Sequence, residues 1–334
     1  MSGEIILVTG GAGYVGAHVT RKLLDRGYRV RVLDNFLYGD QGLADVRGNA
    51  ELDVRYGDIC NEADVRDAVD SCRAVVALAA LVGDAACDVD PENAVAVNYR
   101  STKLMIDACR HHRVGRLVFA SSCSVYGANG RDAVTESSPL HPVSLYARTR
   151  IMSEELLAAE HGDVDVVSLR LATVCGLSPR MRFDLMVNTI TARAAIDGRV
   201  QILGPGQWRP HVHVQDAAEA FVRAVEAERE PGATIYNVGE NNQNFTVAEI
   251  ARKVVELLPD TVVEYEDRNH DSRSYRVSFD RIRHDLGFSP TYCVDDAIRE
   301  VYAVLQEGAI SDYRAPVFHN VKHLQANAVR RSSV

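Results

Sequence analysis

The sequence predicts a doubly wound α/β fold: a parallel β-sheet with helices on both faces and a smaller, interleaved C-terminal subdomain. Three observations predict it. Short β-branched runs alternate with amphipathic stretches through the first half of the chain. A glycine-rich turn joins the first run to the first amphipathic stretch. The chain has 334 residues, 46% hydrophobic and 25% charged, which suits one large globular domain or two intimate ones.

The first half of the chain alternates strands and helices in a regular order. A continuously apolar run such as 5–10 is typical of a buried parallel strand, whereas 28–35 alternates apolar and polar residues. Successive strands joined by right-handed crossovers give one parallel sheet. We expect strands at 5–10, 28–35, 53–58, 74–80, 116–122 and 165–174, and helices at 14–27, 62–72, 98–112 and 144–160.

The alternation loosens after Cys175. We expect one helix within 176–199, a strand at 211–214, a helix with Asp216 as its N-cap, a helix that Thr246 opens, and a last helix at 294–308. The polar end of the chain is expected to be partly disordered. The resulting division is a sheet domain of 1–174 and 211–238, a subdomain of 175–210 and 239–310, and a tail of 311–334.

The composition excludes several classes of function. A net charge of −9 disfavours nucleic acid and anionic membranes as partners. No apolar run is long enough to cross a bilayer, and the N-terminal residues carry no secretory signal. Seven cysteines without a C-x-x-C pair favour the reducing cytoplasm over a disulfide framework or a zinc site. His211 and His213 would share one face of a strand, where packed side chains are a better interpretation than a metal pair, so no metal is expected.

The stretch VTGGAGYVG at 8–16 follows the first predicted strand and opens the first helix. It spaces Gly10, Gly13 and Gly16 so that the backbone turns tightly, and Tyr14 and Val15 complete the loop. Glycine lets the chain approach a pyrophosphate that binds at the helix N-terminus. This stretch therefore predicts a dinucleotide site.

Asp34 ends the second predicted strand about twenty residues further on. A carboxylate there accepts hydrogen bonds from the adenosine ribose, and with Asn35 beside it the pair favours NAD over NADP. The alternative is an aspartate that only stabilises a turn. Further cofactor contacts are expected from residues after the third and fourth strands and at the start of the next helix: Asp58, Ile59, Leu78, Ala79, Ala80 and Asn98.

Eight pieces of the sequence together resemble one known family. TGGAGYVG, LDN, GDI, LAA, VFASSCSVYG, YARTR, RLATVCG and RPHVHVQD occur in the order found in the extended short-chain dehydrogenase/reductase family, in its nucleotide-sugar epimerase/dehydratase branch of the UDP-glucose 4-epimerase type. The resemblance implies a Rossmann domain that binds NAD and a subdomain that binds a nucleotide-diphosphate sugar. It also implies a homodimer that pairs the helices around 98–112 and 146–161.

The resemblance assigns the catalytic residues. Tyr146 matches the general base of the Y-x-x-x-K motif, and Arg150 takes the lysine position. Both residues would also contact the cofactor. Arginine keeps the charge that stabilises a phenolate, but its planar fork is not chemically equivalent to lysine. Ser122 matches the serine that hydrogen-bonds the reacting sugar hydroxyl. Where the 4,6-dehydratases carry Asp-Glu, this chain has Cys123 and Ser124, which disfavours dehydration.

The resemblance also assigns contacts to the substrate. Arg209 and Arg273 match arginines that bind the nucleotide diphosphate. The remaining expected contacts are Ser122, Ser124, Thr173 and Asn188. The implied activity is NAD-dependent epimerisation of a hexose or heptose, with inversion at C4 through a transient 4-keto intermediate. A 4-dehydrogenase or 4-ketoreductase with net cofactor turnover, and a non-catalytic NAD-binding regulator, remain alternatives.

Overall fold

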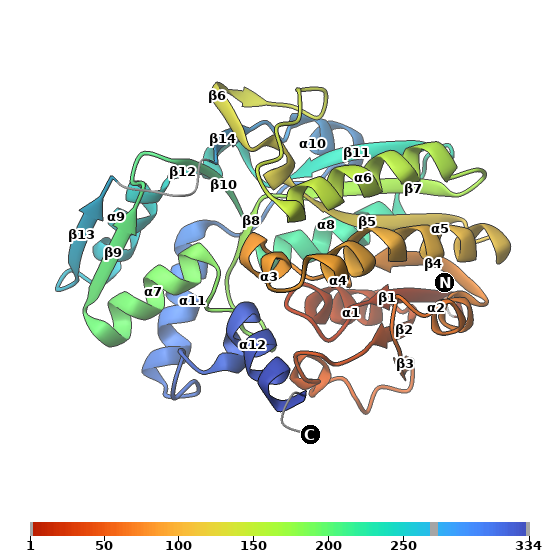
Figure 1. Cartoon of the computed structure of the whole chain (residues 1–334), viewed down its shortest axis with the longest axis horizontal. Coiled ribbons are helices and arrows are strands. Elements are labelled where there is room, and N and C mark those ends of the chain that lie inside the picture. The colour runs from red at the N-terminus through yellow and green to blue at the C-terminus, as the bar shows by residue number, and fades with distance from the viewer. Residues whose placement is uncertain (1–2, 268–272, 332–334) are drawn as a thin grey trace.

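The fold is built around one parallel sheet. The structure, a computed structural model, describes residues 3–267 and 273–331. Seven strands pair in parallel in the order β11-β7-β5-β4-β1-β2-β3, so the strand order reverses between β1 and β4 (Figure 1). Ligands of such sheets bind at the carboxyl ends of the strands on either side of this reversal. The strands are β1 (Ile5–Thr9), β2 (Arg29–Asp34), β3 (Leu52–Tyr56), β4 (Cys72–Ala77), β5 (Arg116–Ser122), β7 (Asp165–Leu171) and β11 (Ala233–Val238).

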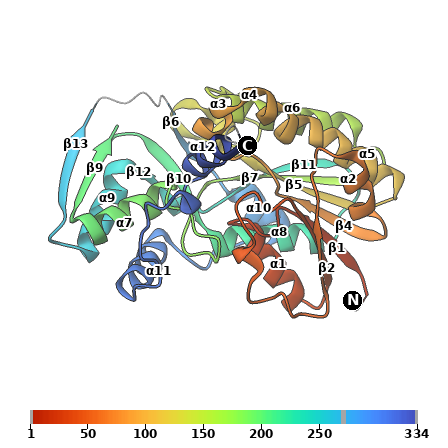
Figure 2. The same ribbon diagram turned by 60° about the horizontal axis from the view of Figure 1, so that its bottom comes forward.

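Helices cover both faces of this sheet, as the alternation in the sequence predicted. Figure 2 shows α5 and α6 on one side and α1 and α8 on the other. The side chains of each strand alternate between the two faces, so Val8 packs toward α1 and α8 while Leu7 packs toward α2 and α5. Each fully buried side chain of this size contributes roughly 1.5–3 kcal/mol. The helices are α1 (Gly16–Asp25), α2 (Glu62–Val69), α5 (Ser101–His111), α6 (Leu145–Glu160) and α8 (Val214–Glu226).

Short elements after β4 and β5 lie beside the carboxyl edge of the sheet. Two short helices, α3 and α4, lead into a π-helical turn, η2, that runs directly into α5. The 3₁₀ turn η3 follows β5 immediately. The bounds are η1 (Gln41–Leu43), α3 (Asp84–Val89), α4 (Pro91–Val95), η2 (Ala96–Arg100) and η3 (Cys123–Tyr126).

A smaller lobe interleaves with the sheet domain. Its own core joins α7, α9 and α11 through side chains such as Val187, Ile250 and Ile298. Short sheets frame it, in the orders β12-β10-β8, β13-β9 and β14-β6. Its elements are β6 (Ala128–Val134), β8 (Thr173–Cys175), α7 (Met186–Asp197), β9 (Arg199–Leu203), β10 (Trp208–His213), η4 (Asn241–Gln243), β12 (Asn244–Thr246), α9 (Val247–Leu257), β13 (Val262–Glu266), β14 (Ser274–Val277), α10 (Asp280–Leu286) and α11 (Val294–Gln306).

The end of one predicted strand and the whole of another belong to the small lobe rather than to the main sheet. The strand expected at 165–174 ends at Leu171, and Thr173 begins β8. β8 pairs with β10, the strand expected at 211–214. The chain therefore changes sheets at Ala172, and only α8 and β11 of the segment 211–238 lie with the sheet domain.

The predicted N-cap of α8 was wrong. His213 occupies that position, and its ring nitrogen Nδ1 accepts a hydrogen bond from the backbone N–H of Gln215. Asp216 lies in the first turn instead, where its carboxylate accepts hydrogen bonds from the backbone N–H groups of Thr291 and Tyr292. The helix dipole stabilises a negative charge in the first turn, so an aspartate suits this position. Its hydrogen-bond partners, however, lie in a distant loop.

The partial disorder expected at the end of the chain stays a prediction, although part of this segment is regular in the described residues. Residues 316–318 form the 3₁₀ turn η5 (Pro316–Phe318), and α12 (Asn320–Arg331) follows it directly. Residues 332–334, the end of the predicted tail, lie outside the described residues. In the described ranges, no helix is both long and apolar enough to span a membrane.

Candidate active site

The glycine-rich loop forms a cradle between β1 and α1. Gly10 has φ = +72°, and a Cβ there would lie 2.9 Å from the backbone of Ala79. A Cβ on Gly16 would overlap the carbonyl oxygen of Gly10. Glycine is therefore required for the loop to turn this close to the end of β4. The side chain of Tyr14 points away from the cradle, because its hydroxyl donates to the carbonyl of Gly176 at 2.6 Å, so Tyr14 offers a ligand only its backbone.

Asp34 lies at the carboxyl end of β2, next to this cradle. Its carboxylate accepts hydrogen bonds from the N–H groups of Ala12 at 3.0 Å and Phe36 at 2.8 Å. Burial raises the pKa of Asp34, and the two N–H donors and the charge of Arg180 oppose this shift. The carboxylate thus lies where a ribose would bind, and it also holds the loop after β2 against the glycine-rich loop.

Arg180 approaches this end of the site from the small lobe. Its guanidinium carbon lies 4.4 Å from the centroid of the Tyr38 ring, and only 5% of the residue is exposed. Its Nε atom and the hydroxyl of Tyr38 are buried without a hydrogen-bond partner. Buried polar groups normally have partners, so two such atoms beside Asp34 indicate a binding site for a polar ligand. Neither Arg180 nor Tyr38 is part of a local motif that would mark it as a ligand contact.

Asn98 is hydrogen-bonded to the loop that follows β4. It is 1% exposed, and its amide both donates to and accepts from the backbone of Leu81, at 2.9 Å each. Its backbone carbonyl lies in the π-helical turn and accepts hydrogen bonds from Ser153 and Arg150. Both polar atoms of the amide bind Leu81, and the expected contact of Asn98 with the cofactor stays a prediction.

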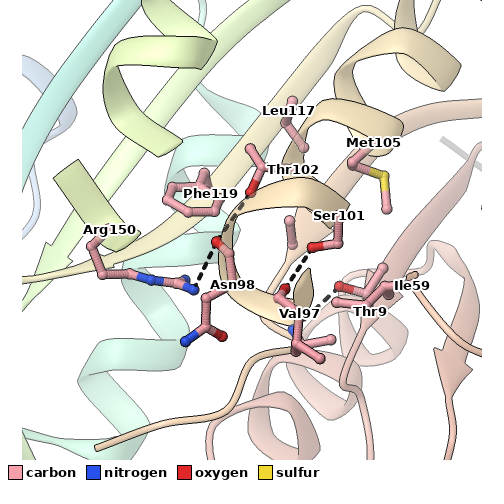
Figure 3. Close-up of a pocket in the computed structure, with 12 residues that line it drawn as sticks. Thr9, Ile59, Val97, Asn98, Ser101, Thr102, Met105, Leu117, Phe119 and Arg150 are labelled. Atoms are coloured by element: carbon pink, nitrogen blue, oxygen red, sulfur yellow. Dashed lines mark hydrogen bonds between the residues drawn. The ribbon is translucent and has the colours of Figure 1, made fainter. Parts of the chain in front are cut away.

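Tyr146 and Arg150 lie one turn apart on α6, as the motif predicts. The guanidinium carbon of Arg150 is 5.4 Å from the centroid of the Tyr146 ring. Its Nη2 donates to the carbonyl of Asn98 at 3.2 Å (Figure 3). Its Nη1 donates to the carbonyl of Ala120 at 3.1 Å, and Nε has no partner. Burial raises the pKa of Tyr146, and the charge of Arg150 is the largest effect that lowers it.

A small cavity lies beneath this pair. Figure 3 shows Arg150, Asn98 and Phe119 on one side of it and Thr9 and Ile59 on the other. Its volume of about 20 Å³ is close to that of a single water-sized space, so it is too small for a nucleotide. The guanidinium of Arg150 thus lines this cavity and binds the carbonyls of Ala120 and Asn98, an orientation that the motif does not predict.

The end of β5 presents a group of small polar side chains. Ser122 accepts a hydrogen bond from the backbone N–H of Ser124 at 3.1 Å, which starts the turn η3. The hydroxyl of Ser124 is buried and has no partner. The thiol of Cys123 points away, since it is 1% exposed and donates to the carbonyl of Arg170. Burial raises the pKa of Cys123 far above its usual range.

The two expected phosphate-binding arginines lie near each other. Arg209 is 5% exposed, and its guanidinium donates to the carbonyls of Trp208 and Arg273 and to the side chain of Gln207. Arg273 forms an ion pair with Asp84 of α3 at 2.7 Å. Asp84 also acts on the pKa of Tyr146, so α3 brings a carboxylate to the same site. The sequence analysis missed Asp84, because nothing local distinguishes it from a helix-starting aspartate.

Asn188, one of the expected substrate contacts, is hydrogen-bonded within the protein, and its contact with a substrate stays a prediction. It is 0% exposed, and its amide is hydrogen-bonded to Gly176, Arg182 and the hydroxyl of Tyr14. These bonds hold the strand β8 against the glycine-rich loop, so the residue joins the two lobes. Thr173 is half-buried at the start of β8, opposite His211 of β10, and its contact with a substrate stays a prediction.

Residues 6–239 match the family described as "NAD dependent epimerase/dehydratase family". The chain belongs to this family. It is 29% identical to UDP-glucose 4-epimerase of Rhizobium leguminosarum bv. trifolii, over 90% of this chain and 97% of the relative. It is 31% identical to dTDP-glucose 4,6-dehydratase of Streptomyces griseus, over 89% of this chain and 93% of the relative. The solved complex of Thermus thermophilus UDP-glucose 4-epimerase with NAD is 26% identical with a TM-score of 0.77, covering 90% and 99% of the two chains.

Family membership makes NAD the cofactor, and the residues of this chain fit it. The glycine cradle, the carboxylate of Asp34 and the unpartnered polar atoms of Arg180 and Tyr38 line one end of the site. Tyr146, which packs in the apolar cluster of Leu81, lies at the other end of this site. In the parts of the chain that the structure describes, no group of three or more His, Cys, Asp or Glu side chains is arranged to hold a metal ion.

Proposed function

We propose that this family member is a nucleotide-diphosphate-sugar epimerase that inverts C4 of a hexose or heptose through a transient 4-keto intermediate. The observation that carries the proposal is the turn after β5. The positions that would hold the Asp-Glu pair of a 4,6-dehydratase have a buried thiol that binds a backbone carbonyl, at Cys123, and a neutral hydroxyl, at Ser124. Neither side chain can act as the acid and base that remove water.

Tyr146 is the general base of the proposed reaction. Burial favours the neutral phenol, so the free protein holds its proton at neutral pH, and Arg150 provides positive charge that favours the phenolate. Bound NAD supplies a hydride acceptor that later returns the hydride. Tyr146 takes the proton of the C4 hydroxyl and returns it to the same oxygen once hydride has been added to the opposite face of the 4-keto sugar, while Ser122 hydrogen-bonds this oxygen.

The nucleotide diphosphate lies on the side of the small lobe in this proposal. Arg209 and Arg273 provide two guanidinium groups, which suit bidentate binding of phosphate. Arg273 would exchange its ion pair with Asp84 for the diphosphate when the substrate binds. In a protein of net charge −9, such a local pair of arginines is needed to hold an anionic substrate.

The proposal is tested with a panel of nucleotide-diphosphate hexoses and heptoses. We expect a C4-inverted sugar with the original nucleotide and no accumulation of NADH. The variant Tyr146→Phe should lose turnover while its NAD content and melting temperature stay those of the wild type. Stoichiometric NADH would show a net dehydrogenase instead, and unchanged turnover in Tyr146→Phe would exclude this residue as the base.

The homodimer also remains a proposal. The resemblance pairs the helices that are now α5 and α6. Met152 of α6 is 39% exposed, which suits an apolar contact with a second copy. Sedimentation equilibrium of wild type and Met152→Glu tests it, since a buried glutamate would weaken the dimer.

A further inference from the structure

The C-terminal segment of the chain is fixed to the loop that follows β8. Phe183 packs edge-on against both Tyr313 and Phe318, with ring centroids 5.7 and 5.6 Å apart. Its backbone N–H also donates to the carbonyl of Phe318 at 2.9 Å. Tyr313 is buried, and its hydroxyl donates to Asp197 at 2.6 Å. This anchor sets where α12 begins.

From this anchor, α12 reaches both walls of the cofactor site. Figures 1 and 2 show it beside α3 at the carboxyl edge of the main sheet. On one wall, Nε2 of His323 lies 2.7 Å from the carbonyl oxygen of Leu37, just after β2, and the ring lies 5.3 Å from that of Tyr38. On the other wall, Leu324 packs in the apolar cluster of Leu81, after β4, to which Tyr146 also belongs.

Asn320 connects α12 to the polar end of the same site. Its Oδ1 accepts a hydrogen bond from Nη2 of Arg180 at 2.7 Å, and its Nδ2 donates to the carbonyl of Val82 at 3.4 Å. Its backbone N–H donates to Asp184 at 3.2 Å. The side chain is 4% exposed, so these bonds are shielded from water. Asn320 thereby holds Arg180 in place against Tyr38, with its unpartnered Nε beside Asp34.

We propose that α12 is a clamp on the bound dinucleotide and that Asn320 and His323 are its positioning residues. They hold Arg180 and the loop after β2 around the adenosine end of NAD, so release requires α12 to move. This inference rests on the proposed function in one respect: an epimerase regenerates its cofactor in each turnover and so benefits from retaining it. A fold-wide role of α12 would instead change stability without changing release of NAD.

The experiment measures the rate of NAD release from purified holoenzyme, without sugar substrate, by dilution into a trap of excess competing dinucleotide. The variants are a chain that ends at Phe318, Asn320→Ala and His323→Ala. Gln325→Ala is the matched control, since this residue is exposed on the same helix. We expect release to be about tenfold faster in each point variant and faster still in the shortened chain, because each lost hydrogen bond is worth roughly one factor of ten. The melting temperature of the NAD-free point variants should stay within a few degrees of wild type.

Wild-type release rates in Asn320→Ala and His323→Ala would overturn the clamp, and the point variants decide this even where the shortened chain does not fold. Tighter binding in the shortened chain would also overturn it, because α12 would then obstruct the site. Equal acceleration in Gln325→Ala would show a non-specific effect of the helix. Since no sugar is present, these outcomes are independent of whether the enzyme inverts C4.

Discussion

The charge of Arg150 should set the pH at which Tyr146 becomes an effective base. The guanidinium carbon lies 5.4 Å from the centroid of the Tyr146 ring. A unit charge at about this separation favours the phenolate by about 3 kcal/mol at an effective dielectric constant of about 20, which corresponds to about a hundredfold in ionisation. Replacing Arg150 by methionine removes the charge while keeping much of the buried apolar volume. The pKa of Tyr146 should therefore rise.

The assay is the pH dependence of turnover for the holoenzyme. The reaction needs the phenolate, so activity rises as the pH increases through the pKa of Tyr146. In Arg150→Met, we expect this acid limb to move to higher pH, with turnover near pH 7 reduced by up to about a hundredfold. The melting temperature and NAD content serve as controls for folding.

The lysine variant separates charge from shape. Arg150→Lys keeps the positive charge, so the acid limb should stay near that of the wild type. Lysine lacks the fork that donates to the carbonyls of Ala120 and Asn98, and an unsatisfied carbonyl costs about 1–3 kcal/mol, so the free energy of unfolding should fall. An acid limb in Arg150→Met that coincides with the wild-type profile would refute the electrostatic reasoning. Loss of activity in Arg150→Lys as large as in Arg150→Met would show that the fork itself is required.

Three further changes have defined outcomes. Burial lowers the pKa of His211 to about 4, so below about pH 6.5 the unfolded chain binds a proton at this histidine that the folded chain does not bind. The free energy of unfolding should therefore drop by up to roughly 3 kcal/mol as the pH falls from about 6.5 to about 4. Urea unfolding across this range should show less of that loss in His211→Gln, and an identical slope would contradict it. Glu154→Ala leaves Arg170 buried without its carboxylate, whose bond is 2.6 Å, so urea unfolding should show a loss of about 3–5 kcal/mol, and a loss below about 1 would argue against it. In NAD titrations, Gly16→Ala should abolish binding because its Cβ would overlap a backbone carbonyl. Gly13→Ala, whose Cβ would have its nearest contact at 3.1 Å, should bind NAD more tightly than Gly16→Ala. Equal effects of the two variants would be inconsistent with this geometry.

The sequence was sufficient to predict the strands of the main sheet. These strands are apolar, and they alternate with amphipathic helices whose apolar residues recur with the helical period. The sequence was insufficient for the short strands of the small lobe. β6 and β14 pair Ala128 with Ser274, and a strand of three to seven residues with such a distant partner has no local signature. The helix α12 was missed for a related reason, since its polar sequence depends on the aromatic anchor around Phe183 for its place.

The site residues divide in the same way. Gly10, Gly16 and Asp34 were predictable because a motif fixes both their chemistry and their backbone context. Asn188 and Asn98 carried the right residue type at the expected place, yet their amides bind the protein itself. Whether a buried amide faces a ligand or a backbone depends on tertiary neighbours, which the spacing of a motif does not encode.

The placement of α12 has a practical consequence for how the protein is made. The N-terminus begins next to β1, on the edge of the sheet opposite the cofactor site, whereas the last described residues lie beside that site (Figure 1). The segment that spans the walls after β2 and β4 is synthesised after both of them, so a nascent chain that lacks it has both walls but not the helix between them. An affinity tag is therefore better attached before β1 than after α12.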